Sequence, residues 1–237
     1  MSVYLMNGVM DVTEDRANGS GRPIASGALD VSRARLIVAA LAVLSLAFGV
    51  LLPIQATLMV LVLLLLGWFY SGPPWYAKRN PFWASTSLVL TGLAAYAAGY
   101  WSAGGGRPDR EVVVLALAMA LAMGLVGVPV KDLSDVEGDR LAGRRSWPVM
   151  WGEARARLAI CCVALAGGGV FVIAAVRWAP ALIAASVVAA TGFAAIAVAV
   201  MSRWSHGPRG SRRRPYRIFM VAAYLTHLAA VTGAALS

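Results

Sequence analysis

The sequence predicts an all-α membrane protein: a multi-pass transmembrane helical bundle that forms one domain over residues 1–237. Apolar residue types make up 59% of the chain, and charged types only 14%. A soluble domain cannot bury that much apolar surface without exposing large apolar patches. Apolar stretches long enough for membrane-spanning helices also recur along the chain.

Seven stretches are long and apolar enough to cross a bilayer, which takes about 20 residues. They are expected at 34–53, 56–72, 82–103, 110–130, 155–177, 180–202 and 215–236. Residues 1–10 are expected to be the end of an eighth helix, whose upstream part the given chain does not contain. The expected architecture is therefore seven complete spans and one truncated N-terminal helix.

The connections between these stretches divide into a basic set and a set with few charges. The basic set comprises 11–33, 73–81, 131–154 and 203–214, and with the adjoining helix ends it holds 18 of the 21 Lys and Arg residues. The two sets alternate, as they must if each helix crosses the bilayer once. Because basic residues concentrate on the cytoplasmic side of membranes, we expect the basic set there, in the plasma membrane of a bacterial cell.

This distribution also accounts for the net charge of +10. Lys and Arg beside a membrane interact with anionic headgroups, so the charge does not require nucleic acid as a partner. The basic run at 209–214 is interpreted in the same way, as a surface segment beside headgroups and not as a binding site.

The most informative stretch, residues 130–149, follows the fourth span. Asp132, Asp135 and Asp139 lie at i, i+3 and i+7, so they share one face if the helix continues past Lys131. Three carboxylates on one face repel one another unless something positive lies between them. Oxygen ligands of this kind suit Mg²⁺, which usually shares a substrate phosphate.

Residues that disturb a helix flank this acidic cluster. Pro129 lies just before it and is expected to loosen the helix. Gly138 and Gly143 are expected to let the chain turn into a loop afterwards.

A second acidic segment, residues 7–27, has the same character. Asn7, Asp11 and Asp15 lie at i, i+4 and i+8, roughly on one helix face, and Arg22 follows in a turn-forming segment. The acids suit a metal and the arginine suits phosphate oxygens. A charged loop at a helix end is the alternative, but two such clusters on one membrane side favour a site. We expect the two segments to face each other across a magnesium diphosphate.

The two lysines of the chain lie near these segments. Lys78 follows the aromatic stretch at 68–76, and Lys131 directly precedes the acids at 132–139; all nineteen other basic residues are arginines. A compact point charge on a phosphate is one interpretation, and chance placement on the cytoplasmic side is the other. The aromatic stretch is interpreted as an interfacial belt, with a pocket wall that stabilises a cation as the alternative.

These motifs together match a known pattern. N-x₃-D-x₃-D begins at Asn7 and is followed by RPIASG, then by YSGPP and KR, and then by K-D-x₂-D-x₃-D beginning at Lys131. In order and spacing the chain resembles the UbiA superfamily of intramembrane prenyltransferases over essentially its whole length. The resemblance implies a nine-helix horseshoe whose central cavity is capped on the cytoplasmic side by two Asp-rich loops, here 7–27 and 131–149.

The resemblance also implies the chemistry. A prenyl group would pass from a polyprenyl or isoprenyl diphosphate, through an allylic carbocation, to an aromatic or other lipophilic acceptor. One Mg²⁺ would be held by Asn7, Asp11 and Asp15, and the second by Asp132, Asp135 and Asp139, the five aspartates being the catalytic set. The diphosphate would be contacted by Arg22, Lys78 and Lys131. The implied partners are the prenyl diphosphate, the acceptor and membrane lipid, with no nucleic acid.

The family pattern places a full helix and most of another before the first motif, whereas Met1 precedes Asn7 by six residues. The chain therefore resembles a horseshoe that lacks its first helix and most of its second. We expect a misassigned start and a natural protein longer by about fifty residues, enough for one more span and its connections. A trimmed, inactive relative is the alternative.

Two other functions are also compatible with the sequence. The first is a terpene cyclase on the same scaffold, which ionises a prenyl diphosphate without an acceptor. The second is a truncated non-catalytic membrane protein or a cation transporter. For a transporter the mid-helix candidate is His227, because ionisable residues within a span are often functional; a hydrogen bond between helices is the alternative role.

Overall fold

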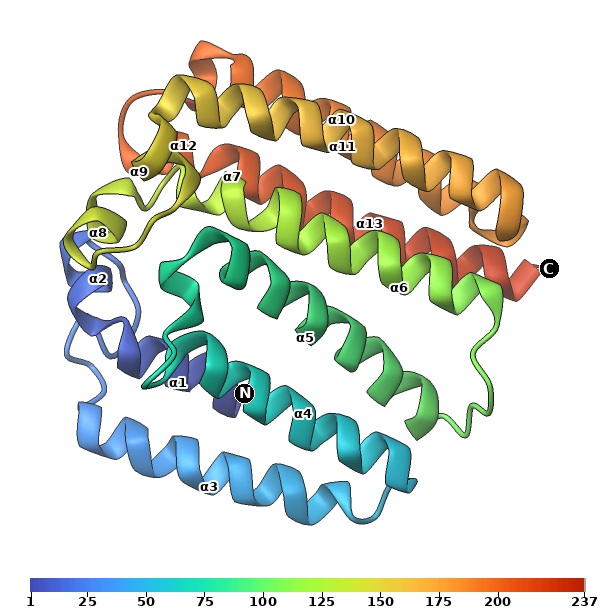
Figure 1. Ribbon diagram of the computed structural model, residues 1–237, viewed down its shortest axis with the longest axis horizontal. Helices are drawn as coiled ribbons and strands as arrows, with labels where there is room; N and C mark the ends of the chain where they lie inside the picture. The colour runs from blue at the N-terminus through green and yellow to red at the C-terminus, as the bar shows by residue number, and fades with distance from the viewer. Residues whose placement is uncertain (237) are drawn as a thin grey trace. The chain divides into compact units, whose positions relative to one another are not determined.

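A computed structural model describes residues 1–236 and the side chains of residues 1–233. Ser237, the last residue of the expected domain, lies outside the described residues. The described chain is helical and contains no strand, which confirms the all-α class (Figure 1). The helices are α1 (Ser2–Met10), α2 (Val12–Ala17), α3 (Val31–Gly49), α4 (Ile54–Ser71), η1 (Ala77–Arg79), α5 (Pro81–Ser102), α6 (Arg110–Ala122), η2 (Met123–Gly127), α7 (Val128–Asp132), α8 (Val136–Leu141), α9 (Trp147–Trp151), α10 (Glu153–Trp178), η3 (Pro180–Leu182), α11 (Ile183–Met201), η4 (Arg203–Ser205), α12 (Arg209–Arg212) and α13 (Arg214–Leu236).

The chain forms two compact units. The first comprises Met1–Arg107 and Glu137–Arg145, and the second comprises Pro108–Val136 and the chain from Ser146 onward. The second acidic segment is thus divided between them, since Asp132 and Asp135 belong to the second unit and Asp139 to the first. The single domain over 1–237 stays a prediction.

In the first unit α3, α4 and α5 follow one another as long antiparallel helices, and the short α1 packs against α3 and α4 (Figure 1). Two of the long helices begin at side-chain caps, which satisfy backbone N–H groups that would otherwise have no partner. The Asp30 carboxylate accepts from the backbone N–H of Ser32 and Arg33 at the start of α3. The Asn80 side chain accepts from Phe82 N–H at the start of α5.

In the second unit α11 packs between α10 and α13, and α6 packs against α10. The buried core contains large side chains from four segments, including Val126, Ile160, Phe171, Ile196 and Phe219. Gly152 separates α9 from α10 with a φ of 79°. This left-handed backbone conformation favours glycine and lets the chain turn directly into α10.

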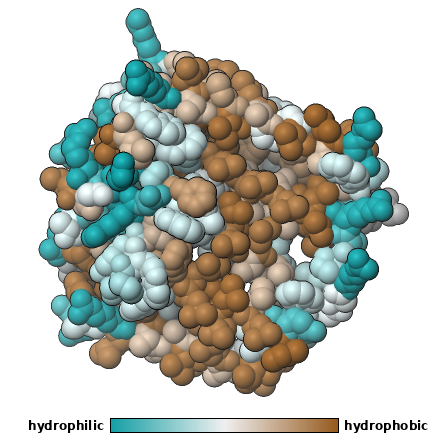
Figure 2. All heavy atoms as spheres, in the orientation of Figure 1, coloured by the Kyte–Doolittle hydropathy of each residue, from teal (hydrophilic) through white to brown (hydrophobic). Residues whose placement is uncertain are grey.

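Large apolar side chains also cover the outside of the long helices. Val43 and Leu65 in the first unit and Val170, Val198 and Val231 in the second are all exposed. On the face drawn in Figure 2, apolar residues cover the middle of the helices while polar residues gather toward helix ends and loops. Exposed apolar surface on this scale is typical of helices that face lipid.

Five helices are long and apolar enough to cross a membrane: Val31–Gly49, Ile54–Ser71, Arg110–Asp132, Glu153–Trp178 and Pro180–Met201. All seven expected spans are helical, but α5 and α13 are not among the five found in the described part of the chain. Both helices contain Thr and Tyr residues, α5 also contains Ser residues, and α13 begins with two arginines in its first turn. These side chains lower the mean hydropathy below that of a clear span.

The helix that leads into the second acidic segment widens before it reaches Pro129. Residues Met123–Gly127 form a π-helix, and Val128 N–H donates to the Met123 carbonyl five residues earlier. Proline has no N–H to donate and its ring crowds the carbonyl of the preceding turn, so the wider turn accommodates it. The expected loosening of the helix is therefore present, and π-helical turns are frequent at functional sites.

Candidate functional site

The N-terminal acidic segment lies on α1 and α2 of the first unit. The helix is interrupted at Asp11, where φ is −100° and ψ is 12°. The hydrogen-bond ladder nevertheless continues, because Asp11 N–H donates to Asn7 O at 2.9 Å and Asp15 N–H to Asp11 O at 2.8 Å. The three predicted ligands are thus carried by successive turns of backbone, although not by one regular helix.

The aspartates of this segment are buried and paired with predicted phosphate-binding residues. Asp11 forms an ion pair with Lys78, whose side chain is itself buried. Arg22 Nη1 lies 2.9 Å from Asp15 Oδ2 and 4.0 Å from Asp11 Oδ2. The structure therefore brings together four residues that the sequence assigned to one site.

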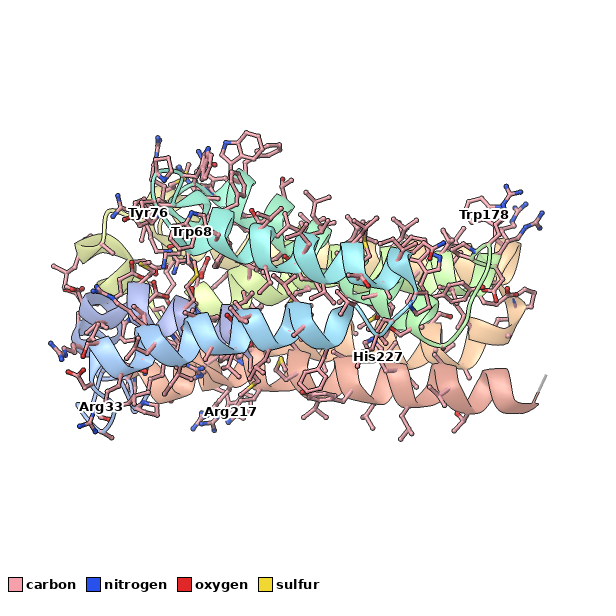
Figure 3. The ribbon with its side chains drawn as sticks, turned by 90° about the horizontal axis from the view of Figure 1, so that it is seen from below. Arg33, Trp68, Tyr76, Trp178, Arg217 and His227 are labelled. Carbon is pink, nitrogen blue, oxygen red and sulfur yellow. The ribbon has the colours of Figure 1, made fainter. Side chains whose placement is uncertain are left out.

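The connection between α4 and α5 positions Lys78. The indole N–H of Trp68 donates to the Pro73 carbonyl at 2.9 Å, which ties the connection to the end of α4. Tyr76 has a φ of 43°, the left-handed conformation that is uncommon for a bulky residue, and it starts the short helix η1 that carries Lys78. Trp68 and Tyr76 lie at the same end of the unit (Figure 3). The Tyr76 ring contacts the Arg79 guanidinium, 4.6 Å from the ring centroid.

Asn7 is oriented by a residue that the sequence did not indicate. Its Oδ1 accepts a hydrogen bond from the Ser71 hydroxyl at 2.8 Å, and Ser71 is fully buried at the end of α4. A hydrogen bond of this kind satisfies an amide that is withdrawn from water in part. Ser71 belongs to the YSGPP motif, but a serine at the end of an apolar helix does not by itself indicate a contact with Asn7.

The second half of the other acidic segment, residues 137–145, lies against the N-terminal segment within the same unit. Gly138 N–H donates to Asn18 Oδ1 at 2.9 Å. A Cβ atom at position 138 would lie 2.8 Å from the Glu14 carbonyl oxygen. Gly138 is therefore required for the close approach of α8 to α2 and not for a turn, which corrects the expected role. Gly143 follows α8 with a φ of 68°, as a turn residue.

Arg144 is a second residue that the sequence did not indicate. Its guanidinium is buried, with Nη1 at 3.3 Å from Asp139 Oδ1 and 3.8 Å from Glu14 Oε2, while Nε donates to the Lys78 carbonyl at 3.3 Å. Arg144 thus contacts both acidic segments and the backbone of Lys78. Arg144 stands beside a second arginine and two residues before Ser146. This local sequence is like that of an ordinary basic loop.

Glu14 belongs to the same cluster, and its pKa lies above the ordinary value. Burial and, to a smaller extent, the Asp11 carboxylate raise the pKa of Glu14 to about 7, against the opposing effects of Lys78 and Arg144. Two neighbouring carboxylates in a buried place disfavour a second negative charge. The N-terminal segment therefore gains or loses a charge near neutral pH.

In the second unit the helix does not continue past Asp132 as expected. Helix α7 ends there, residues 133–135 form a turn, and α8 begins at Val136. Asp132 and Asp135 remain together on the turn, where Asp135 N–H donates to Asp132 O at 3.1 Å, and both side chains are buried. The physical reason is the wider π-helical turn and Pro129, which shift the register before the acids.

Two cations hold Asp135. Lys131 Nζ lies 2.7 Å from Asp135 Oδ2, and Arg209 Nη2 lies 2.9 Å from Oδ1. Burial alone would raise the pKa of Asp135, but Lys131 and Arg209 together hold it well below its usual range. Arg209 was expected in a surface run beside headgroups. It belongs instead to the candidate site, because α12 carries it to a buried carboxylate 74 residues away in the sequence.

Magnesium is the cofactor that the sequence implies for these residues. Among residues 1–236, no three His, Cys, Asp or Glu side chains are arranged to hold a metal ion. Mg²⁺ keeps several waters and is commonly bound through one or two carboxylates together with substrate phosphates. The buried aspartates supply hard oxygen donors in such numbers, two in the first segment and two on the turn. The donor set therefore fits Mg²⁺.

His227 was the mid-helix candidate for transport. Its Nδ1 lies 2.7 Å from the carbonyl oxygen of Ala223, one turn earlier in α13. The ring is thus bonded to the backbone of its own helix.

A family model described as the UbiA prenyltransferase family matches residues 1–233, which include both units. The chain belongs to the UbiA prenyltransferase family. The resemblance that the motifs indicated is confirmed, and it extends over nearly the whole chain.

Curated relatives and solved structures agree with this assignment. Somaliensene A/B synthase of Streptomyces somaliensis is 32% identical over 164 residues, covering 66% of this chain and 50% of that protein. Digeranylgeranylglyceryl phosphate synthase of Pyrococcus abyssi is 32% identical over 156 residues, covering 65% of this chain and 53% of that protein. The chain spans about half the length of these two relatives.

A UbiA homolog from Archaeoglobus fulgidus, solved bound to GPP and Mg²⁺, matches with a TM-score of 0.69 at 22% identity. The match covers 98% of this chain and 82% of the homolog. At this identity the likeness concerns the fold, and the chain has the UbiA fold.

Proposed function

We propose that this UbiA family member is a Mg²⁺-dependent prenyltransferase that moves a prenyl group from a prenyl diphosphate to a lipophilic acceptor. The carrying observation is the pairing of buried aspartates with lysines, Asp11 with Lys78 and Asp135 with Lys131. Burying a charged group costs free energy even when the group is paired, which favours a functional role for these buried aspartates over a role in stability alone. Family membership supports the same chemistry.

The paired residues suit a diphosphate and its metal ion. Lys78, Lys131 and Arg22 would donate hydrogen bonds to phosphate oxygens, each leaving the carboxylate that it now contacts. The released oxygens of the acids, together with Asn7, would hold Mg²⁺. The metal ligands proposed are Asn7, Asp11, Asp15, Asp132, Asp135 and Asp139. Bound Mg²⁺ supplies positive charge that stabilises the departing diphosphate.

The bond that breaks and the bond that forms can both be followed in this reaction. The bond between C1 of the prenyl chain and the diphosphate oxygen breaks, and both electrons leave with the oxygen. The lysines and Arg22 stabilise the negative charge that develops there, Arg22 through its planar guanidinium and the lysines as compact charges. The allylic carbocation that remains then accepts an electron pair from the acceptor, which forms the new bond, and the acceptor finally releases one proton to the departed diphosphate.

We further propose that the acidic segments face the cytoplasm of a bacterial cell, in its plasma membrane. The uneven distribution of Lys and Arg supports this orientation. A cytoplasmic site would receive the water-soluble diphosphate headgroup directly, while the prenyl chain and the acceptor would enter from the bilayer.

The test is a product assay on the protein in membranes with Mg²⁺, a prenyl diphosphate series and candidate lipophilic acceptors. We expect diphosphate release that depends on both Mg²⁺ and an acceptor. Asp11→Asn and Asp135→Asn should each lower the rate by about a hundredfold or more, because each removes a charged interaction with the reacting diphosphate complex. The matched control is Asp109→Asn, since Asn also caps a helix well and Asp109 only caps α6.

Unchanged turnover in both site variants would refute the catalytic assignment. A cyclic product formed without added acceptor would instead identify a terpene cyclase on the same scaffold. Equal losses in Asp109→Asn would show that the changes act through folding and not through the site.

A further inference from the structure

Outside the acidic site, the second unit contains an apolar groove of about 610 Å³ between α11 and α13. Small side chains keep it open along its length. Its walls include Thr191, Gly192 and Ala195 of α11 and Ile218, Val221 and Ala222 of α13. Gly192 brings the two helices together, because a Cβ there would meet the Ala222 methyl group. The groove therefore lies where α11 and α13 pack closely against each other.

One end of the groove is basic and aromatic. Trp204, Arg214 and Arg217 line it there. The Arg214 guanidinium lies over the Trp204 ring, 4.7 Å from its centroid, and also donates to the Trp204 carbonyl. Arg217 is exposed and points outward from α13 (Figure 3). A tryptophan with two arginines at the end of an apolar helix pair is typical of a membrane interface.

The positive charge at this end is not balanced by the protein. Glu153 is the last acidic residue in the sequence, and nine arginines follow it. Glu153 itself pairs with Arg157 at 2.7 Å and with Arg212 at 3.6 Å. In the part of the chain that the structure describes, no acidic side chain pairs with Arg214 or Arg217. An anion from outside the protein is the remaining partner for these two guanidinium groups.

We propose that this groove binds an anionic phospholipid, with its phosphate at Arg214 and Arg217 and an acyl chain along α11 and α13. Basic pockets between membrane helices favour anionic headgroups, and guanidinium groups bind phosphate through two parallel hydrogen bonds. A soluble anion would leave the apolar walls in contact with water, and an uncharged lipid would leave the arginines unbalanced. An anionic phospholipid satisfies both ends of the groove.

The proposal is tested by native mass spectrometry of the purified full chain with added palmitoyl-oleoyl phosphatidylglycerol or phosphatidylcholine. We expect the wild type to retain phosphatidylglycerol in preference to phosphatidylcholine. Arg214→Ala with Arg217→Ala should weaken phosphatidylglycerol binding by about thirtyfold, since two interfacial cations are lost. The control is Arg33→Ala with Arg177→Ala, which removes the same charge from exposed positions outside the groove.

A second pair of variants tests the acyl-chain part. Ala195→Trp fills the groove from an exposed position and should also weaken binding, whereas Val198→Trp adds the same bulk on α11 outside the groove. The proposal would be overturned by an equal loss of binding in the double arginine control or in Val198→Trp. Full binding in Ala195→Trp would also overturn it. Displacement of the lipid by inorganic phosphate would assign the arginines to a soluble anion and would overturn it as well.

Discussion

At the scale of single residues, the candidate site consists of acids that are buried because cations accompany them. Asp11 and Lys78 are both almost fully buried, and each would be costly to bury alone. Removing one partner of such a pair commonly costs about 3–5 kcal/mol, because the other charge stays buried without compensation. The pairs therefore hold the acids in place and at the same time keep beside them the cations that we propose to bind phosphate.

Glu14 gives a prediction about pH. Its folded pKa of about 7 lies above the ordinary value of 4.5, so the folded state binds more protons than the unfolded state between these values. Its contribution to stability is fully present below pH 4.5 and is lost as the pH rises through 7. This loss is absent in Glu14→Gln. We therefore expect the free energy of unfolding of the variant to rise by about 2 kcal/mol relative to wild type as the pH goes from 5 to 8.

The measurement is the melting temperature in detergent at pH 5, 6, 7 and 8. For a chain of this size the gain corresponds to several degrees, at about 2–4 °C per kcal/mol. Glu137→Gln is the control, because Glu137 is exposed on α8. A difference between Glu14→Gln and wild type that stays constant with pH would contradict the assignment.

At the scale of elements, the approach of α8 to α2 decides how the two acidic segments meet in the first unit. Asn18 accepts from Gly138 N–H, and Arg144 reaches both Glu14 and Asp139 from just beyond α8. This contact depends on the absence of a side chain at position 138. A methyl group there would meet backbone that cannot move aside easily.

Gly138→Ala is therefore expected to push α8 away from α2. Overpacking of this kind typically costs about 1–3 kcal/mol, and the displacement of Asp139 and Arg144 should lower prenyl diphosphate turnover as well. Melting temperature and turnover are measured together. Gly210→Ala is the matched control, because a Cβ there meets no atom within 4 Å. If both substitutions leave stability and turnover unchanged, the close approach is not required.

At the scale of the whole molecule, the distribution of basic residues predicts the orientation in the membrane. Single cysteines are introduced at Gly21 and at Gly106, where a Cβ meets no atom within 4 Å, in a chain whose Cys161 and Cys162 are replaced by alanine. We expect a membrane-impermeant thiol reagent to label Gly106→Cys in intact bacterial cells and Gly21→Cys only after permeabilisation. The reverse pattern would place the acidic segments outside the cell.

Much of the candidate site could be predicted because its residues belong to two short motifs. Lys131 and Asp135 are one helical turn apart, so sequence spacing alone predicts their contact. Asp11 and Asp15 are related in the same way. Spacing could not predict the end of α7 at Asp132, which follows a π-helical turn. It also could not predict the cations that reach Asp11 and Asp135 from other segments.

The sequence by itself determined the all-α membrane class, the positions of the long helices and most of the charged residues of the site. Apolar length and motif spacing are local properties, and they are visible in the order of residues. Only the tertiary structure decided that Arg144 joins three segments, that Arg209 reaches Asp135, and that Gly138 serves a close approach. These contacts join residues 66, 74 and 120 positions apart, and folding brings them together through packing that no local pattern records.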